Sequence, residues 1–69
     1  MAPPPPPLTA HELETLQLIA DGFTNREIAA LLGVSEDTVK ARMRVVFAKL
    51  RTRSRSHAVA LGFRRGLLR

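Results

Sequence analysis

The 69-residue chain contains no cysteine, which excludes disulfide bonds and zinc sites built on thiolates. Its two histidines, His11 and His57, lie far apart in the sequence and form no metal-ligand cluster. No apolar run approaches the roughly 20 residues that span a bilayer, and the N-terminus lacks the regions of a signal peptide. We therefore predict a cytoplasmic protein without a metal or other cofactor.

The chain also lacks the residue combinations of a catalytic site. No nucleophile, base and orienting acid occur in a plausible combination, and there is no glycine-rich phosphate loop. The serines have other roles, since they stand at predicted helix starts or within a basic segment. We therefore expect a protein that is not an enzyme. In a single domain of this size one hydrophobic core is marginal, which favours association with a partner chain.

Acidic residues are missing from the second half of the chain. Residues 38–69 contain ten basic residues and no acidic one, whereas residues 1–37 contain all six acidic residues and one basic residue, Arg26. The two halves therefore carry formal charges of +10 and −5. Such a distribution predicts a polyanion-binding surface on the second half, and nucleic acid is the commonest polyanion. A membrane surface fits less well, because the apolar residues there are needed for the core.

Five consecutive prolines dominate residues 1–7. A proline run cannot be helical, so this lead is expected to be an extended polyproline II or disordered segment. Three interpretations remain open, a stiff spacer, a docking segment and the remnant of a linker to a further domain, and the spacer suits so short a run better than a docking segment. The folded domain is then expected to comprise residues 8–69.

Helix starts and stops follow at short intervals. Thr9 and Glu12 match a capping box that opens a helix over about residues 10–20, which Asp21-Gly22 ends. A second capping box at residues 24–27 opens a helix that Gly33 stops after about two turns. Only Val34 separates this glycine from Ser35, the predicted N-cap of the next helix. The pattern of helix, tight turn and helix is a helix-turn-helix, in which the second helix enters the major groove of DNA.

The helix over about residues 36–50 has two contrasting faces. At about 100° per residue one arc is an apolar stripe facing the core, formed by Val39, Met43, Val46, Phe47 and Leu50. The opposite face sets long cations among small side chains and consists of Lys40, Ala41, Arg44, Val45 and Ala48, with Arg42 and Lys49 on the flank. This face suits a groove, although an amphipathic helix with a merely solvated basic face has the same pattern.

A fourth helix is predicted over about residues 55–65, capped by Ser54 and ended by Gly66. It is apolar over more of its circumference than one small core covers. Either Leu67 and Leu68 fold back over the remaining face, or the helix self-associates with Gly62 allowing two backbones to approach closely. We favour self-association.

These residues and their spacing carry a resemblance to a known family. The blocks concerned are Leu8-Thr9 with Glu12 and Glu14, Gly22, Thr24 to Ala29, Leu32 to Ser35, Thr38-Val39-Lys40, Lys49-Leu50, Arg53-Ser54-Arg55, Ala58-Val59 and Gly66-Leu67. From Leu8 to Leu68 the sequence resembles the LuxR/FixJ/GerE-type DNA-binding domain of bacterial transcription regulators. The pair Arg51-Thr52 departs from the family, which usually has a small residue or Asn followed by Val there.

The resemblance implies an all-α, bundle-like domain of four helices with a central helix-turn-helix. It further implies a sequence-specific regulator that binds double-stranded DNA with residues of about 36–50 in the major groove. The residues at base-contacting positions are Lys40, Ala41 and Arg44. Those at backbone-contacting positions are Asn25, Ser35, Thr38, Arg42 and Lys49. A homodimer, formed either in solution or only on DNA, would use Ala58, Val59, Leu61 and Gly62.

Two alternatives share parts of the pattern. Region 4 of a sigma factor also has a helix-turn-helix with a Thr-Val-Lys and a Lys-Leu-Arg ending, and it binds promoter DNA as part of RNA polymerase. The residues from Arg53 to Leu68 argue against it, because a sigma factor does not need a further helix there. The other alternative is an interaction module that contacts RNA polymerase or another regulator, with the prolines as its docking segment.

Overall fold

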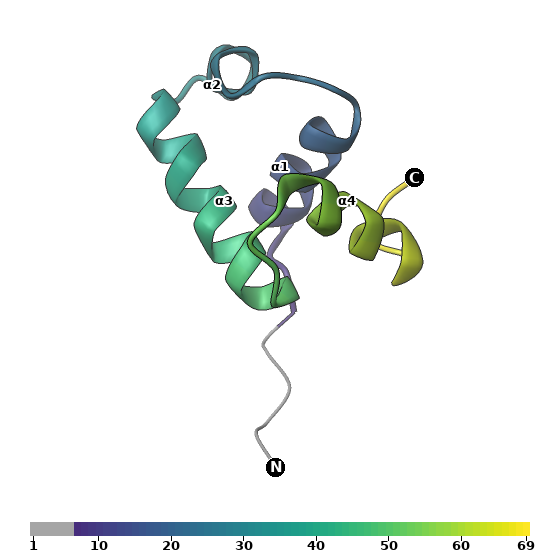
Figure 1. Ribbon diagram of the computed structural model, residues 1–69. Helices are drawn as coiled ribbons and strands as arrows, with labels where there is room; N and C mark the ends of the chain where they lie inside the picture. The colour runs from purple at the N-terminus through teal and green to yellow at the C-terminus, as the bar shows by residue number, and fades with distance from the viewer. Residues whose placement is uncertain (1–6) are drawn as a thin grey trace.

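The computed structural model describes residues 7–69, which form four α-helices and no strand. The helices are α1 (Ala10–Ala20), α2 (Asn25–Leu32), α3 (Glu36–Leu50) and α4 (Arg55–Arg64). Figure 1 shows α3 along one side of the molecule, α2 across one end of it, and α4 beside α1. The predicted all-α class is confirmed. Except for Pro7, the predicted proline-rich lead lies outside the described residues.

The helix starts form as the sequence predicts. In the capping box of α1, Thr9 Oγ1 accepts from the Glu12 amide at 3.2 Å and the Thr9 amide donates to the Glu12 carboxylate at 2.8 Å. Thr24 and Glu27 repeat this arrangement at α2, with distances of 3.2 and 2.9 Å. Serine hydroxyls cap α3 and α4. Each cap satisfies amides that the first helical turn leaves without a partner, so these local motifs set where the helices begin.

The core consists of two adjoining clusters. The first joins α1, α3, α4 and the C-terminal segment and contains Leu16, Val46, Leu50, Ala58 and Leu68. The second joins α1, α2 and α3 and contains Ile19, Ile28, Ala29, Val39 and Met43. Phe47 and Val59 pack against both clusters. The apolar stripe predicted for α3 thus faces the core, and this packing fixes which side of the helix is turned outward.

The turn between α2 and α3 is short because of Gly33. Its φ of 68° and ψ of 34° are left-handed, a conformation that glycine adopts without strain. The Val34 amide then donates to the Ala29 carbonyl at 3.0 Å, which closes the end of α2. Ser35 follows directly as the N-cap of α3. The predicted helix-turn-helix is therefore present, with α3 as its second helix.

The end of the chain folds back over α4, as the first of the two interpretations of this helix expects. The amides of Leu67 and Leu68 donate to the Gly62 carbonyl at 2.8 and 3.3 Å, and the Leu68 side chain is 9% exposed. A Cβ on Gly62 would lie 2.7 Å from Leu68 Cδ1, so this glycine makes room for the chain's own tail. Ala58 is fully buried in the same cluster. Gly62 and Ala58, both predicted at the dimer interface, are thus covered by the chain itself. The helix also ends at Arg64, one residue before the predicted boundary.

No helix among residues 7–69 has the length and apolar run that crossing a membrane requires.

Candidate nucleic-acid interface

The outward face of α3 is basic and free of bulky obstruction. Lys40, Ala41, Arg44, Val45 and Ala48 are all exposed on it. The structure therefore brings the three residues predicted to meet base edges onto one accessible surface. Behind them the helix is held by buried apolar residues, which fix its rotation about its own axis. The packing of the fold therefore holds this face open to solvent.

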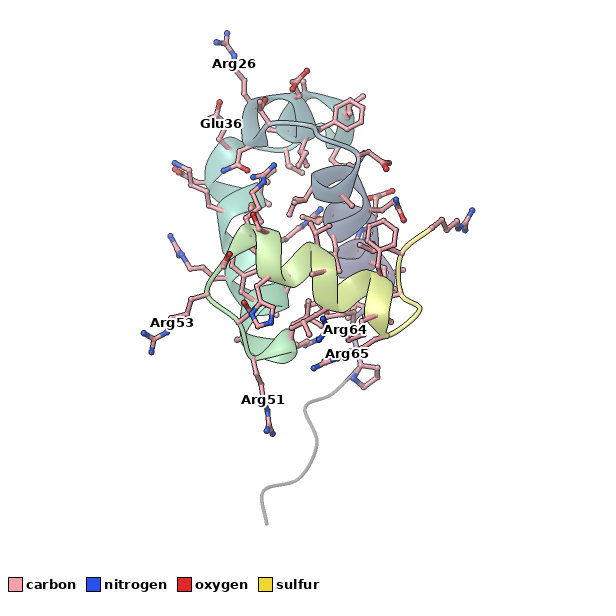
Figure 2. The ribbon with its side chains drawn as sticks, turned by 45° about the vertical axis from the view of Figure 1, so that its right-hand side comes forward. Arg26, Glu36, Arg51, Arg53, Arg64 and Arg65 are labelled. Atoms are coloured by element: carbon pink, nitrogen blue, oxygen red, sulfur yellow. The ribbon has the colours of Figure 1, made fainter. Side chains whose placement is uncertain are left out.

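Charge is graded along α3. Glu36 and Asp37 stand in its first turn, where negative charge is favourable near the positive end of the helix dipole, and Lys49 stands in its last turn. Figure 2 shows Glu36 at the same end of the molecule as Arg26, while Arg51 and Arg53 extend from the link after α3 at the opposite end. The cationic part of the face therefore begins at Lys40 and continues beyond the C-terminus of the helix.

Two shallow hollows flank the basic face. The first lies between α2 and α3 and is lined by Asn25, Lys40, Met43, Arg44 and Phe47. The second lies at the junction of α3 and α4, and its lining includes Arg44, Ala48, Arg51, Arg53 and His57. Because Arg44 and Phe47 belong to both linings, the two hollows and the helix face form one continuous surface. We call this surface the α3 basic surface.

Asn25 is oriented by Arg55, a residue without a predicted role. Arg55, at the start of α4, donates from Nη1 to Asn25 Oδ1 at 3.1 Å and from Nη2 to the Phe23 carbonyl at 2.6 Å. Guanidinium groups only donate, so the amide oxygen of Asn25 must face Arg55 and its NH2 group points elsewhere. This leaves the NH2 available to an anion at the first hollow. Asn25 and Arg55 are thirty residues apart, and no local pattern marks such a pair.

Ser35 and Thr38 form a second polar pair, at the start of α3. Ser35 Oγ accepts from the Thr38 amide at 3.1 Å and lies 2.9 Å from Thr38 Oγ1. That contact uses one hydroxyl hydrogen, so the other hydroxyl hydrogen can still be donated to an outside acceptor. The helix cap and a contact to an anion are therefore compatible here.

Lys49, predicted to contact a phosphate, bonds within the chain in this structure. Its Nζ lies 2.6 Å from Glu12 Oε1 and 3.3 Å from the Pro7 carbonyl, and the side chain is only 17% exposed. The hydrogen bond from Lys49 and that from the Thr9 amide hold the pKa of Glu12 below its usual value, against a small opposing effect of burial. Lys49 therefore joins α3 to the start of α1. Arg42, the other flanking cation, is half-buried.

The described residues contain no group of three or more metal-ligating side chains. The α3 basic surface offers hydrogen-bond donors and positive charge. A helix-turn-helix whose second helix presents such a face defines the class of helix-turn-helix DNA-binding domains.

Comparison with known proteins identifies the family. The family model GerE, described as bacterial regulatory proteins of the luxR family, matches residues 6–61. The transcriptional regulatory protein YdfI of Bacillus subtilis is 43% identical over 61 residues, which are 88% of this chain and 29% of that protein. The nitrate/nitrite response regulator protein NarP of Escherichia coli is 44% identical over 54 residues, 78% of this chain and 25% of that protein.

The solved structure of the transcription factor GerE has a TM-score of 0.84 at 32% identity and covers 90% of this chain and 92% of that chain. The response regulator ChrA of a heme-sensing two-component system has a TM-score of 0.88 at 35% identity, with 94% of this chain and 32% of that chain covered. This chain belongs to the luxR family of bacterial regulatory proteins, a family of helix-turn-helix DNA-binding transcription regulators and not of enzymes. It spans less than a third of the length of YdfI or NarP.

Proposed function

We propose that this chain binds double-stranded DNA at specific sequences, with α3 in the major groove, and that it regulates transcription in this way. The observation that carries the proposal is the exposed basic face of α3, which stands opposite its packed apolar stripe. An α-helix with its side chains is about 10–12 Å wide and fits a major groove of about 12 Å. Small residues at positions 41, 45 and 48 let the helix approach closely.

Base contacts are assigned to three residues on this face. Arg44 has the geometry for two hydrogen bonds to a guanine, and Lys40 can donate to guanine acceptors. Ala41 presents a methyl group that suits the methyl of thymine. These assignments follow the family resemblance, and the exposure of all three side chains supports them.

Backbone contacts are assigned to Asn25, Ser35, Thr38 and Arg42, and not to Lys49. Asn25 has its NH2 group turned away from Arg55, and the pair of Ser35 and Thr38 retains one free hydroxyl hydrogen. Such contacts hold the protein in register but do not distinguish sequences. Lys49 is left out because its charge is already paired with Glu12.

Dimerisation is proposed through the outer side of α4. On that side Phe63 is 51% exposed and the neighbouring Val59 is half-buried. Leu61 is half-buried on the opposite flank of the helix, and Ala58 and Gly62 face inward. One short helix buries little area between two copies, so we expect a monomer in solution that pairs on DNA. Replacing Phe63 by Gln should then reduce cooperative binding to a two-part site, while the same replacement of Leu31 on α2, which is 58% exposed, should not. Equal cooperativity in both variants would show that α4 does not form the dimer contact.

Selection from a random duplex pool tests the proposed function directly. We expect enrichment of a site with two inverted halves, bound with an affinity that falls steeply as salt rises. No enrichment would contradict sequence-specific binding. A single promoter-like element bound only with RNA polymerase would favour the sigma-like alternative.

A further inference from the structure

Arg51 adopts a backbone conformation that usually requires glycine. It is the C-cap of α3, with φ 58° and ψ 46°, in the left-handed region. The other residues with positive φ in the described part of the chain are Gly22, Gly33 and Gly66. A side chain in this conformation brings Cβ close to the following carbonyl, which glycine avoids. Position 51 therefore carries backbone strain, whereas glycine relieves this strain at the other left-handed positions.

The fold makes no visible use of the Arg51 side chain. The residue is exposed, and no hydrogen bond or ion pair joins its guanidinium to another residue among 7–69. Its backbone amide closes the end of α3 on the carbonyls of Phe47 and Ala48, which a glycine would do equally well. A strained residue with no internal role points to a role outside the chain.

The surroundings of Arg51 are cationic and adjoin the α3 basic surface. Arg51, Arg53 and His57 line the hollow at the junction of α3 and α4, and no acidic residue lines it. Its floor is closed by Thr52, whose hydroxyl is 3.0 Å from His57 Nδ1 and accepts from the Ser54 amide at 3.2 Å. In Figure 2 the side chains of Arg51 and Arg53 extend from this link into solvent. The rim of the hollow is therefore positively charged and can bind a large anion that lies across it.

With α3 in the groove, as proposed above, the length of the helix brings this rim toward the groove's edge. At about 1.5 Å per residue, Arg51 lies roughly 10 Å beyond Arg44 along the helix axis, close to the width of the major groove itself. If Arg44 meets base edges within the groove, the end of α3 reaches the groove's edge, where phosphates lie. Guanidinium groups bind phosphate oxygens in pairs.

We propose that Arg51, together with Arg53, binds a backbone phosphate of the DNA beyond the bases that α3 reads. This proposal rests on the proposed function, since it assumes α3 in the groove. It assigns to this chain a contact at a position where the resemblance leads us to expect a small residue or Asn.

The test uses Arg51→Gly in the full chain, with Arg65→Gly as the matched control. Both replace an exposed arginine at a helix C-cap by glycine and remove one charge, but Arg65 lies at the far end of α4 from the hollow. Glycine suits the backbone at position 51, so the melting temperature of Arg51→Gly should stay equal or rise. We expect its affinity for the selected duplex to fall about fivefold to tenfold, with a log-log salt slope shallower by about one.

A second measurement locates the phosphate. A series of duplexes carries one neutral methylphosphonate each, at successive backbone positions. The wild-type protein should bind one of them more weakly, the one modified just outside the bases that α3 reads. Arg51→Gly should bind that duplex as well as it binds the unmodified duplex. Equal binding and equal salt slopes for Arg51→Gly and Arg65→Gly, with a wild-type protein that does bind, would overturn this proposal alone. A wild-type protein that binds no duplex would overturn the proposed function together with it.

Discussion

The two halves of the molecule use their charged residues in opposite ways. In α1 and α2 the carboxylates of Glu12 and Glu27 close capping boxes, and Asp21 accepts a hydrogen bond from Gln17. In α3, α4 and their link, the described cations are mostly exposed, and only Lys49 and Arg55 bond inward through their side chains. Three of the carboxylates thus stabilise helix ends, whereas most of the cations remain available to a partner.

This comparison also shows why net charge overstates a binding surface. Lys49 and Arg55 belong to the basic half by sequence, yet one is paired with Glu12 and the other orients Asn25. Variants at inward-bonded residues should therefore change stability, and variants at outward residues should change DNA affinity. The following variants test this division.

The largest loss of stability is expected from Leu16→Ala, because Leu16 is fully buried between α1, α3 and α4. Removing a buried leucine side chain costs about 2–5 kcal/mol of unfolding free energy, which should unfold much of so small a domain. Chemical denaturation measures the loss. Leu31→Ala is the control, since Leu31 is 58% exposed and its variant should stay within about 0.5 kcal/mol. Similar losses at both positions would contradict the packing described.

Arg44→Ala should have the opposite profile, with unchanged stability and weaker DNA binding. We expect a loss of about 1–3 kcal/mol in binding free energy and a relaxed preference at one base pair. Binding measured on duplexes with each base substituted in turn checks this. A uniform loss on all sequences would move Arg44 to the backbone-contacting residues.

Arg42→Ala and Lys49→Met separate the two flanking cations of α3. Arg42→Ala should weaken binding to all duplexes alike and make the salt slope shallower by about one. Lys49→Met should leave that slope unchanged and lower stability by roughly 1.5 kcal/mol, because it removes a hydrogen bond between charged groups that are largely shielded from solvent. If Lys49→Met reduced the slope as much as Arg42→Ala, Lys49 would contact phosphate after all.

Acidification should produce the smallest effect. Hydrogen bonds lower the pKa of Glu12 in the folded protein, chiefly the one from Lys49, and the Thr24 amide lowers the pKa of Glu27. Because both folded-state pKa values lie below their unfolded values, the stability they contribute is complete above the ordinary value of about 4.5 and is lost as pH falls through the folded pKa. Unfolding measured between neutral and acidic pH should show less pH dependence in Glu12→Gln than in wild type, whereas the exposed Glu14→Gln should behave as wild type.

Sequence reasoning worked where the determinants are local. The four helices could be predicted from capping residues three positions apart, and the outward face of α3 from an apolar stripe at helical spacing. Sequence reasoning did not find the pairs of Lys49 with Glu12 and Arg55 with Asn25, which are 37 and 30 residues apart. For Gly62, an apolar helix face is equally compatible with a second copy and with the chain's own tail. Only the position of Leu68 over Gly62 distinguishes the two.

The central claim is that the outward face of α3 meets DNA while α1 supports the fold. The most direct test is a titration of isotope-labelled protein with the selected duplex, followed by amide chemical shifts in NMR spectra. We predict the largest shifts at Lys40, Ala41 and Arg44, with little change at Glu14 on α1. Large shifts on α1 with an unperturbed α3 would contradict the account.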